Sequence, residues 1–390
     1  MRNCKLPAFL ALSTLIFAGP VHADVLGEDI TPYISWRISD TSNLFREPDN
    51  ETSARFQETS LGVRGDVEIG RQELTFDVRQ ADVKFADETQ LDYRPLDAGA
   101  EFKWRVGNSI HGKLLGSYEE VLSDFSQDLL GNRTRDVETR SRQEIEANYE
   151  PSSRIRMQGV LSRYTLRHSE RVRKDTNEDQ DEIELSLLFR TGAGTFIGVS
   201  GSLIEGDYPN RDFDPPSLID DGYRQDRYGL AVDWEPSADT SLKIRGGRAE
   251  RNFDNVSSRD YDAPFWSMDL SWSISTRLNL TGLLVRDIVS IDNAVSSVAL
   301  RDSLSLIFDW NVSEKIAIRL DAYVAQDDFQ SVGDERVPKD EYVAGGIRLT
   351  YEVREPLSIG VGAALGNRSS SFDSRDYDNA FYTAYVELRL

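Results

Sequence analysis

Cysteine is almost absent from this sequence. The 390 residues include one, Cys4, which lies in an N-terminal segment that we expect to be removed from the mature chain. Cys4 also lacks the preceding apolar residues of a lipoprotein cleavage motif. The sequence therefore predicts a mature chain with neither a disulfide nor a lipid attachment site, and its stability must come from other interactions.

Histidine is scarce as well. Only His111 and His168 lie beyond the N-terminal segment, and no Cys/His cluster has the spacing of a zinc site. Neither histidine has a suitable neighbour, because no sequence signature places a serine beside it. We therefore expect no catalytic residue, no metal ligand and no cofactor, and we do not expect an enzyme.

Long apolar runs are missing after the N-terminus. Arg2 and Lys5 precede an apolar run over residues 6–18, and Val21-His22-Ala23 then forms a small-x-small cleavage site before Asp24. This pattern predicts a secretory signal peptide over residues 1–23, cleaved near Ala23. No later stretch without charge approaches the roughly 20 residues of a membrane-spanning helix, so we expect no helical anchor.

Basic residues are in the minority. The chain carries 45 Lys and Arg against 67 Asp and Glu, a formal net charge of -22, which disfavours a nucleic-acid partner by repulsion. Acidic chains are often disordered, but the 17 Phe, 15 Tyr and 6 Trp provide far more aromatic surface than a disordered chain has. We expect the chain to fold.

An aromatic residue recurs about every forty residues. Each ends an alternating run, and turn residues follow most of them, as in Trp234-Glu235-Pro236-Ser237. An amphipathic aromatic at the same end of every second strand matches the headgroup level of a bilayer, whereas a soluble sandwich has no reason to repeat it. The predicted membrane-interface girdle is Trp104, Tyr149, Phe189, Trp234, Trp272, Trp310 and Tyr351.

Within these runs, apolar residues alternate with polar ones at a period of two. Examples are Ile183, Leu185, Leu187 and Phe189, between which stand residues such as Glu184. The apolar set is expected to face lipid, and the charged set is expected to face a polar interior.

The spacing predicts the architecture. Nine repeats cover the mature chain, and two strands per repeat give about 18 strands, an even number as in bacterial outer-membrane barrels. We therefore expect an all-β fold: a transmembrane antiparallel up-and-down β-barrel over residues 24–390, with both termini periplasmic. The polar connections expected at the extracellular end are residues 41–56, 121–138, 169–181, 208–225, 252–262, 327–340 and 369–379, with shorter ones near 85–90 and 288–295.

Charged residues of both signs fall on the face expected to line the pore. Opposed rows of arginine and carboxylate would create a transverse field that selects polar solutes. Alternatively, these charges pair across neighbouring strands and hold the wall together. The candidates are Arg64, Asp66, Asp77, Arg79, Lys103, Arg105, Arg227, Arg245, Arg319, Asp321 and Arg348.

Two outer segments are rich in carboxylates, residues 177–182 and 212–221. They could bind calcium or bridge to lipopolysaccharide through divalent ions, but a solvated loop is the more common meaning, since no glycine-centred ligand pattern is present. A second repeat, Ser258-Arg259-Asp260-Tyr261-Asp262, returns as Ser374-Arg375-Asp376-Tyr377-Asp378, which we interpret as rim tyrosines with turn-forming aspartates rather than a ligand site.

Two motifs resemble known protein groups. Apolar residues at every second position up to Leu390 look like the C-terminal signal of outer-membrane proteins, although such signals usually end in an aromatic. After a first strand over residues 33–38, the chain reads Ser39-Asp40-Thr41-Ser42-Asn43-Leu44-Phe45-Arg46. This resembles the start of outer-membrane barrels, of the putative β-barrel porin type, encoded with exopolysaccharide biosynthesis and exosortase (PEP-CTERM) systems; here the usual paired aspartates are spread out.

Three functions follow as hypotheses. The resemblance implies export or assembly of an exopolysaccharide across the outer membrane, with polysaccharide and periplasmic export components as partners. The alternatives are a diffusion porin, general or selective, for small polar solutes, and a surface or adhesive barrel that transports nothing. All three imply the outer membrane of a Gram-negative cell, contact with its lipids and lipopolysaccharide, and insertion by the barrel assembly machinery.

Overall fold

The computed structural model describes residues 30–127, 133–192, 194–213, 220–290, 298–330 and 337–390. The expected signal peptide, residues 1–23, and its cleavage site near Ala23 lie outside the described residues. No helix of the described residues is long and apolar enough to cross a membrane.

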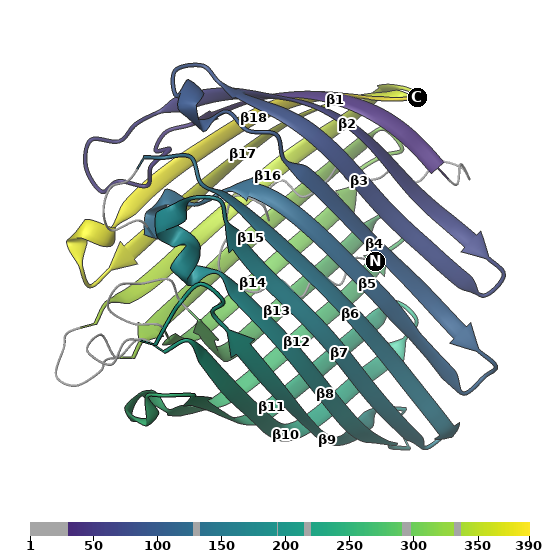
Figure 1. Cartoon of the computed structure of the whole chain (residues 1–390). Helices are drawn as coiled ribbons and strands as arrows, with labels where there is room; N and C mark the ends of the chain where they lie inside the picture. The colour runs from purple at the N-terminus through teal and green to yellow at the C-terminus, as the bar shows by residue number, and fades with distance from the viewer. Residues whose placement is uncertain (1–29, 128–132, 193, 214–219, 291–297, 331–336) are drawn as a thin grey trace.

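The described chain forms one closed antiparallel barrel of 18 strands (Figure 1). Each strand pairs with the next in sequence, and β1 closes the wall by pairing with β18. The expected up-and-down barrel of about 18 strands is therefore confirmed. The strands are β1 (Ile30–Thr41), β2 (Ala54–Ile69), β3 (Gln72–Phe85), β4 (Leu96–Val106), β5 (Ile110–Leu122), β6 (Val137–Ser152), β7 (Ile155–His168), β8 (Glu178–Arg190), β9 (Phe196–Asp207), β10 (Gly222–Ser237), β11 (Thr240–Phe253), β12 (Tyr261–Ser275), β13 (Leu278–Ser290), β14 (Val298–Asn311), β15 (Ile316–Phe329), β16 (Lys339–Arg354), β17 (Leu357–Ser370) and β18 (Tyr377–Arg389).

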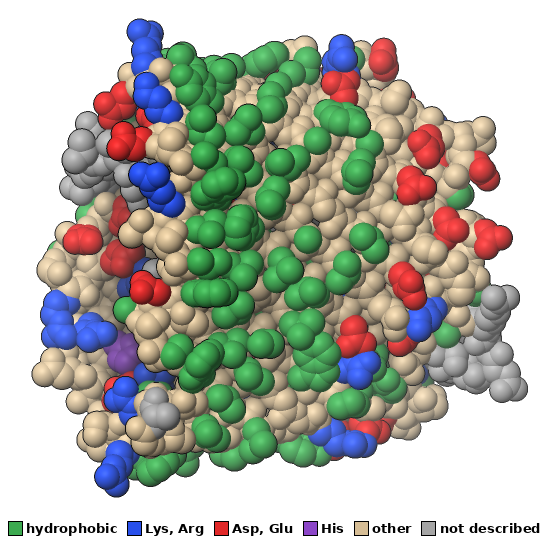
Figure 2. Space-filling model, turned by 180° about the vertical axis from the view of Figure 1, so that it is seen from behind, with side chains coloured by type: hydrophobic (Ala, Val, Ile, Leu, Met, Phe, Trp, Pro, Cys, Tyr) green, Lys and Arg blue, Asp and Glu red, His purple; other side chains and the backbone are tan. Residues whose placement is uncertain are grey.

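The alternation in the sequence becomes two faces of the wall. On β8, Leu185 and Phe189 are 64% and 55% exposed, whereas Ser186 and Leu188 between them are buried. Successive side chains of a strand point to opposite faces, so the exposed apolar set covers the outside of the barrel. Figure 2 shows this set as rows of hydrophobic side chains, with charged side chains gathered toward the two ends.

The two ends of the barrel differ in their connections. Eight short turns join the strands at one end, and the turns at Gly70 and Gly107 use the left-handed backbone that glycine adopts without strain, with φ of 66° and 61°. Nine longer connections join the strands at the other end. Because the number of strands is even, the start of β1 at Ile30 and the end of β18 at Arg389 both lie at the short-turn end.

Two of the outer connections are shorter than the sequence suggested. Residues 169–181 and 208–225 were expected to be loops, but β8 begins at Glu178 and β10 at Gly222. The acidic residues up to Glu182 therefore pair as strand with β7 and β9, as an extension of the wall beyond the apolar belt. There both faces are polar, so the hydrophobic alternation that marks a strand is lost.

Three outer connections share one closing device. Each contains a short 3-10 turn followed by an Asp-Tyr pair at residues 92–93, 260–261 and 376–377. In each, the aspartate accepts a hydrogen bond from the backbone N–H at the end of the preceding strand, with distances of 2.8 Å for Phe85 to Asp92, 2.9 Å for Phe253 to Asp260 and 2.6 Å for Ser370 to Asp376. The repeated aspartates are thus turn-forming, as interpreted from the sequence.

A candidate pore and its charged inner wall

The inner face of β1 to β4 carries a chain of ion pairs. Arg79 on β3 contacts Glu58 on β2 at 2.9 Å and Asp97 on β4, and Arg37 on β1 reaches the same Glu58 at 3.4 Å. One row of alternating charge therefore ties four neighbouring strands together. Asp77 belongs to the same face, and it accepts a 3.0 Å hydrogen bond from the Tyr33 hydroxyl.

The side chain of Arg64, on β2, reaches past β1 to β18, the last strand. Its Nη2 lies 2.8 Å from Glu387 Oε1, and its guanidinium stacks 4.0 Å from the centre of the Tyr33 ring. Arg64 and Glu387 are both nearly buried. Since Tyr33 lies on β1, this contact spans the place where the chain's first and last strands meet.

The opposite wall bends around β9, whose inner face bears small residues such as Gly198, Ser200 and Ser202. Arg245 on β11 therefore reaches over β9 and β10, with Asp233 at 2.7 Å, Glu184 on β8 at 3.6 Å and Gln158 on β7 at 3.2 Å. Small side chains at the bend give the long ones room.

Arg227 on β10 spans the same region. It contacts Glu182 on β8 at 3.3 Å and also Asp287 on β13. These strands are not neighbours in the barrel, so the contacts brace the curvature of the wall as well as the pairing of strands.

The other candidates lie on the same inner face. Lys103 contacts Glu73 at 2.8 Å, and Arg319 contacts Asp309 at 3.8 Å. Arg319 stands directly opposite Arg348, and Asp321 lies two residues further along β15. Asp66 and Arg105 are exposed near the short-turn end.

The inner wall therefore contains the contacts that the wall-pairing interpretation requires. Charges of both signs face inward and pair between strands, and an apolar filling of the barrel is not found among the described residues: their buried apolar residues form four separate clusters. That the eleven charged residues line a conducting path stays a prediction.

The seven girdle aromatics all lie near the ends of even-numbered strands, β4 to β16. Six of them are 40% to 55% exposed, and Trp104 is half-buried. They surround the short-turn end of the barrel, but their contact with lipid headgroups stays a prediction.

The two histidines have different surroundings. His111 lies on β5, directly opposite Arg105. His168 has a close partner, which the sequence analysis missed: its Nδ1 lies 2.6 Å from Asp136 Oδ2, and both residues are nearly buried. Asp136 also accepts a 2.9 Å hydrogen bond from the Glu170 N–H and lies 3.5 Å from Arg173. Asp136 thus joins the connection before β6 to the end of β7 and to the connection that follows it. Among the described residues, no group of three Asp, Glu, His or Cys could hold a metal.

We expect this loop contact to weaken in acid. Burial alone would raise the pKa of Asp136, but its hydrogen bond with His168, the charge of His168 and the Glu170 N–H lower it overall. A carboxylate with a lowered pKa stabilises the fold above its unfolded pKa of about 3.9, and this contribution is lost as the pH falls through the folded value. Wild type should therefore melt at a higher temperature than Asp136→Asn at pH 6, and the gap should narrow as the pH falls below about 3.9. A constant gap would contradict this.

Comparison with known proteins agrees with the architecture. The family described as "Putative beta-barrel porin 2" matches residues 30–390. None of the curated proteins matches. Among solved structures, OccK2 (OpdF) of Pseudomonas aeruginosa is 13% identical, with a TM-score of 0.47, covering 93% of this chain and 98% of that chain.

Two further structures are similar at the same level. The outer membrane protein opdK of Pseudomonas aeruginosa is 13% identical, with a TM-score of 0.46, over 93% of this chain and 99% of that one. A BenF-like porin of Pseudomonas fluorescens is 12% identical, with a TM-score of 0.43, over the same shares. Because the family match spans the whole barrel, this chain belongs to the family "Putative beta-barrel porin 2", as an outer-membrane β-barrel porin.

Proposed function

We propose that the protein is a diffusion channel for small polar solutes across the outer membrane. The observation that carries the proposal is the inner wall, where charged side chains are held by ion pairs instead of being covered by an apolar core. A wall of 18 strands leaves room for an aqueous channel. A polar, water-filled lumen admits hydrated solutes and discourages apolar ones.

The packing of the outer connections favours the passage of small solutes over that of a polymer. Phe45, Leu91 and Phe125 come from three different outer connections and pack in one apolar cluster with the inward-facing Val83 and Phe85. Phe45 and Phe125 meet edge to face, with ring centres 4.9 Å apart. Widening this mouth for a polysaccharide would expose the cluster to water, which costs free energy.

The motif at residues 39–46, which resembles that of polysaccharide-associated barrels, has a structural role in this protein. The Asn43 side chain is fully buried and donates hydrogen bonds to the backbone oxygens of Glu47 at 2.7 Å and Asp378 at 3.0 Å. Arg46 lies over the Tyr377 ring. These contacts hold the first outer loop against β18, whatever passes through the barrel. Export of an exopolysaccharide, with its export partners, stays a prediction that the family match does not support.

The surroundings of Tyr385, on the inner face of β18, support a role in packing rather than in sugar binding. Tyr385 is 8% exposed, and its hydroxyl lies 2.6 Å from the Thr350 hydroxyl. A ring covered in this way offers no open face for a sugar.

Reconstitution tests the proposal. We expect the purified mature chain to produce stable conductance steps in planar bilayers, and liposomes containing it to swell in sugars and amino acids at rates that fall steeply with solute size. A deletion strain should take up small solutes more slowly and secrete polysaccharide normally. A barrel that conducts no ions would overturn the proposal, and polymer retained in the periplasm of the deletion strain would favour export.

A further inference from the structure

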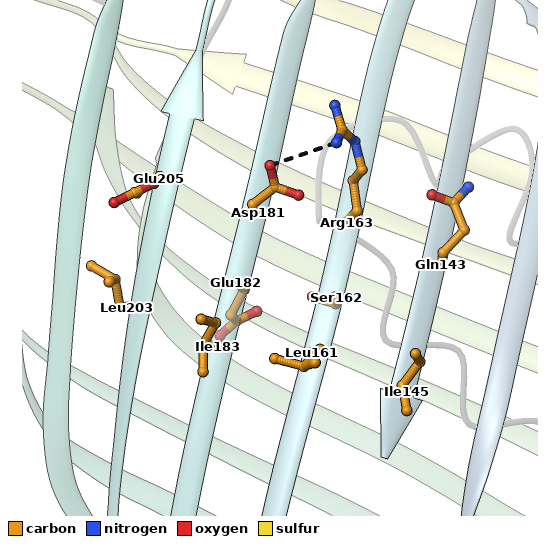
Figure 3. Close-up of a pocket in the computed structure, with 10 residues that line it drawn as sticks. All are labelled: Gln143, Ile145, Leu161, Ser162, Arg163, Asp181, Glu182, Ile183, Leu203 and Glu205. Carbon is orange, nitrogen blue, oxygen red and sulfur yellow. Dashed lines mark ion pairs between the residues drawn. The ribbon is translucent and has the colours of Figure 1, made fainter.

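A hollow lies on the outer surface of the wall, across β6, β7, β8 and β9, with a volume of about 340 Å³. Its side chains form two rows in register around the barrel. Ile145, Leu161, Ile183 and Leu203 make the lower row, and Gln143, Arg163, Asp181 and Glu205 make the upper row (Figure 3). The boundary between the apolar belt and the polar extension of the wall therefore runs through the hollow.

Next to the hollow, small residues keep the outer surface of the wall low. One step further toward the short-turn end, the outward-facing positions are Ala147, Gly159, Leu185 and Gly201, so three of four side chains are small or absent. A side chain added at Gly201 would meet only the Arg227 backbone oxygen, at 3.6 Å. Leu185 covers Gly159, with its Cδ2 3.6 Å from the position of an added side chain, so the groove open to a flexible hydrocarbon chain is the one beside Gly201.

The upper row offers a cation next to two acids. The guanidinium of Arg163 lies 3.8 Å from Asp181, longer than a hydrogen bond, and both side chains are more than half exposed. In contrast, Arg167 just above holds Asp179 at 2.6 Å and 2.8 Å through both carboxylate oxygens. The donors of Arg163 are therefore available to an incoming anion such as phosphate, which a planar guanidinium binds well.

The acids have an unfavourable arrangement without a ligand. Asp181 stands directly opposite Glu205 on the neighbouring strand, and like charges in that position repel. A divalent cation would remove the repulsion. Magnesium is typically bound by one or two carboxylates together with the phosphate oxygens of a ligand, so two carboxylates complete a site only when a phosphate is present.

We propose that this hollow binds lipopolysaccharide of the outer leaflet. One lipid phosphate contacts Arg163, a divalent cation joins that phosphate to Asp181 and Glu205, and an acyl chain lies along the groove past Leu161 and Gly201. The long outer connections place the hollow at the level of the outer leaflet, where the phosphorylated glycolipid is bridged by such ions. This inference goes beyond solute transport, and it stands whether or not the barrel conducts.

Native mass spectrometry of the mature chain in detergent micelles, titrated with bisphosphorylated lipid A and Mg²⁺, tests the proposal. Arg163→Gln should raise the dissociation constant about tenfold, because it removes a charge-assisted contact. Gly201→Leu should raise it similarly by filling the groove. The matched controls are Arg71→Gln at the short-turn end and Gly345→Leu on the outer face of β16, and both should leave binding unchanged. Chelation of Mg²⁺ should weaken binding to wild type.

The alternatives give distinct results. Equal binding of phosphatidylglycerol with the same dependence on Arg163 would overturn the assignment to lipopolysaccharide. Lipid A binding that both site variants leave unchanged would overturn the site itself. Heat-modifiable migration on electrophoresis confirms that each variant is folded, and channel conductance, measured in parallel, reports separately on the proposed function.

Discussion

Replacing Arg375 with methionine is expected to lower the free energy of unfolding by about 3–5 kcal/mol. Arg375 lies in the connection between β17 and β18, and its Nη2 is 2.6 Å from Asp340 Oδ2, with Nε at 3.2 Å. The two side chains are 3% and 0% exposed. Removal of the guanidinium leaves a carboxylate buried without its cation, which costs far more than the ion pair itself contributes.

The control for this prediction is an exposed pair of the same kind. Arg248 contacts Asp262 across β11 and β12, but both side chains are more than half exposed, so Arg248→Met should change stability by less than about 1 kcal/mol. The double variant Arg375→Met with Asp340→Asn should recover part of the loss. Unfolding in urea from phospholipid vesicles measures all three, and equal losses for Arg375→Met and Arg248→Met would contradict the argument.

The second large effect concerns ion selectivity. Arg319 and Arg348 face inward directly opposite each other on β15 and β16. A unit charge about 6 Å from a passing ion in water changes its free energy by about 0.7 kcal/mol, so two charges change it by about 1.4 kcal/mol. The two arginines attract an anion by this amount and repel a cation by the same amount, so replacing both with glutamine should lower the ratio of anion to cation permeability about a hundredfold at low salt.

Reversal potentials in a salt gradient across a planar bilayer measure this ratio. The control is Arg55→Gln on the outer side of β2, which changes the net charge without changing the lumen and should leave the ratio unchanged. The double variant also removes the 3.8 Å contact between Arg319 and Asp309, so heat-modifiable migration on electrophoresis is needed to confirm that it is folded. A permeability ratio that stays constant would show that ions do not pass near these arginines.

The architecture could be predicted because a strand that crosses a bilayer needs apolar residues on its outer face, which gives an alternation of apolar and polar residues. Where the outside meets hydrocarbon, as from Ile183 to Phe189, apolar residues occupy every second position, and the girdle aromatics give the repeat its length. Beyond the belt, this pattern disappears. The upper part of β8 was interpreted as a loop because Asp179 and Asp181 face outward and Glu178 faces inward, and both faces are polar.

The sequence predicted which charged residues face the inside of the barrel, but it could not predict which of them form ion pairs with one another. Alternation places Arg64 inward, but its pairing with Glu387 depends on the closure of the barrel, which joins segments from opposite ends of the sequence. The same holds for His168, the last residue of β7, and Asp136, which lies in the connection before β6. No local signal marks either pair, because their meeting is decided by strand register and by the curvature of the wall.

The barrel closes only when β1 pairs with β18, so a chain that lacks either strand leaves the wall open. Ser39 meets Thr383 through a 3.1 Å contact between residues 344 positions apart. A chain that lacked β18 would have all the remaining strands in place and yet would present two rows of unpaired amide and carbonyl groups to hydrocarbon, where no water can satisfy them. The residues of β18 therefore decide whether the other strands can remain in the membrane.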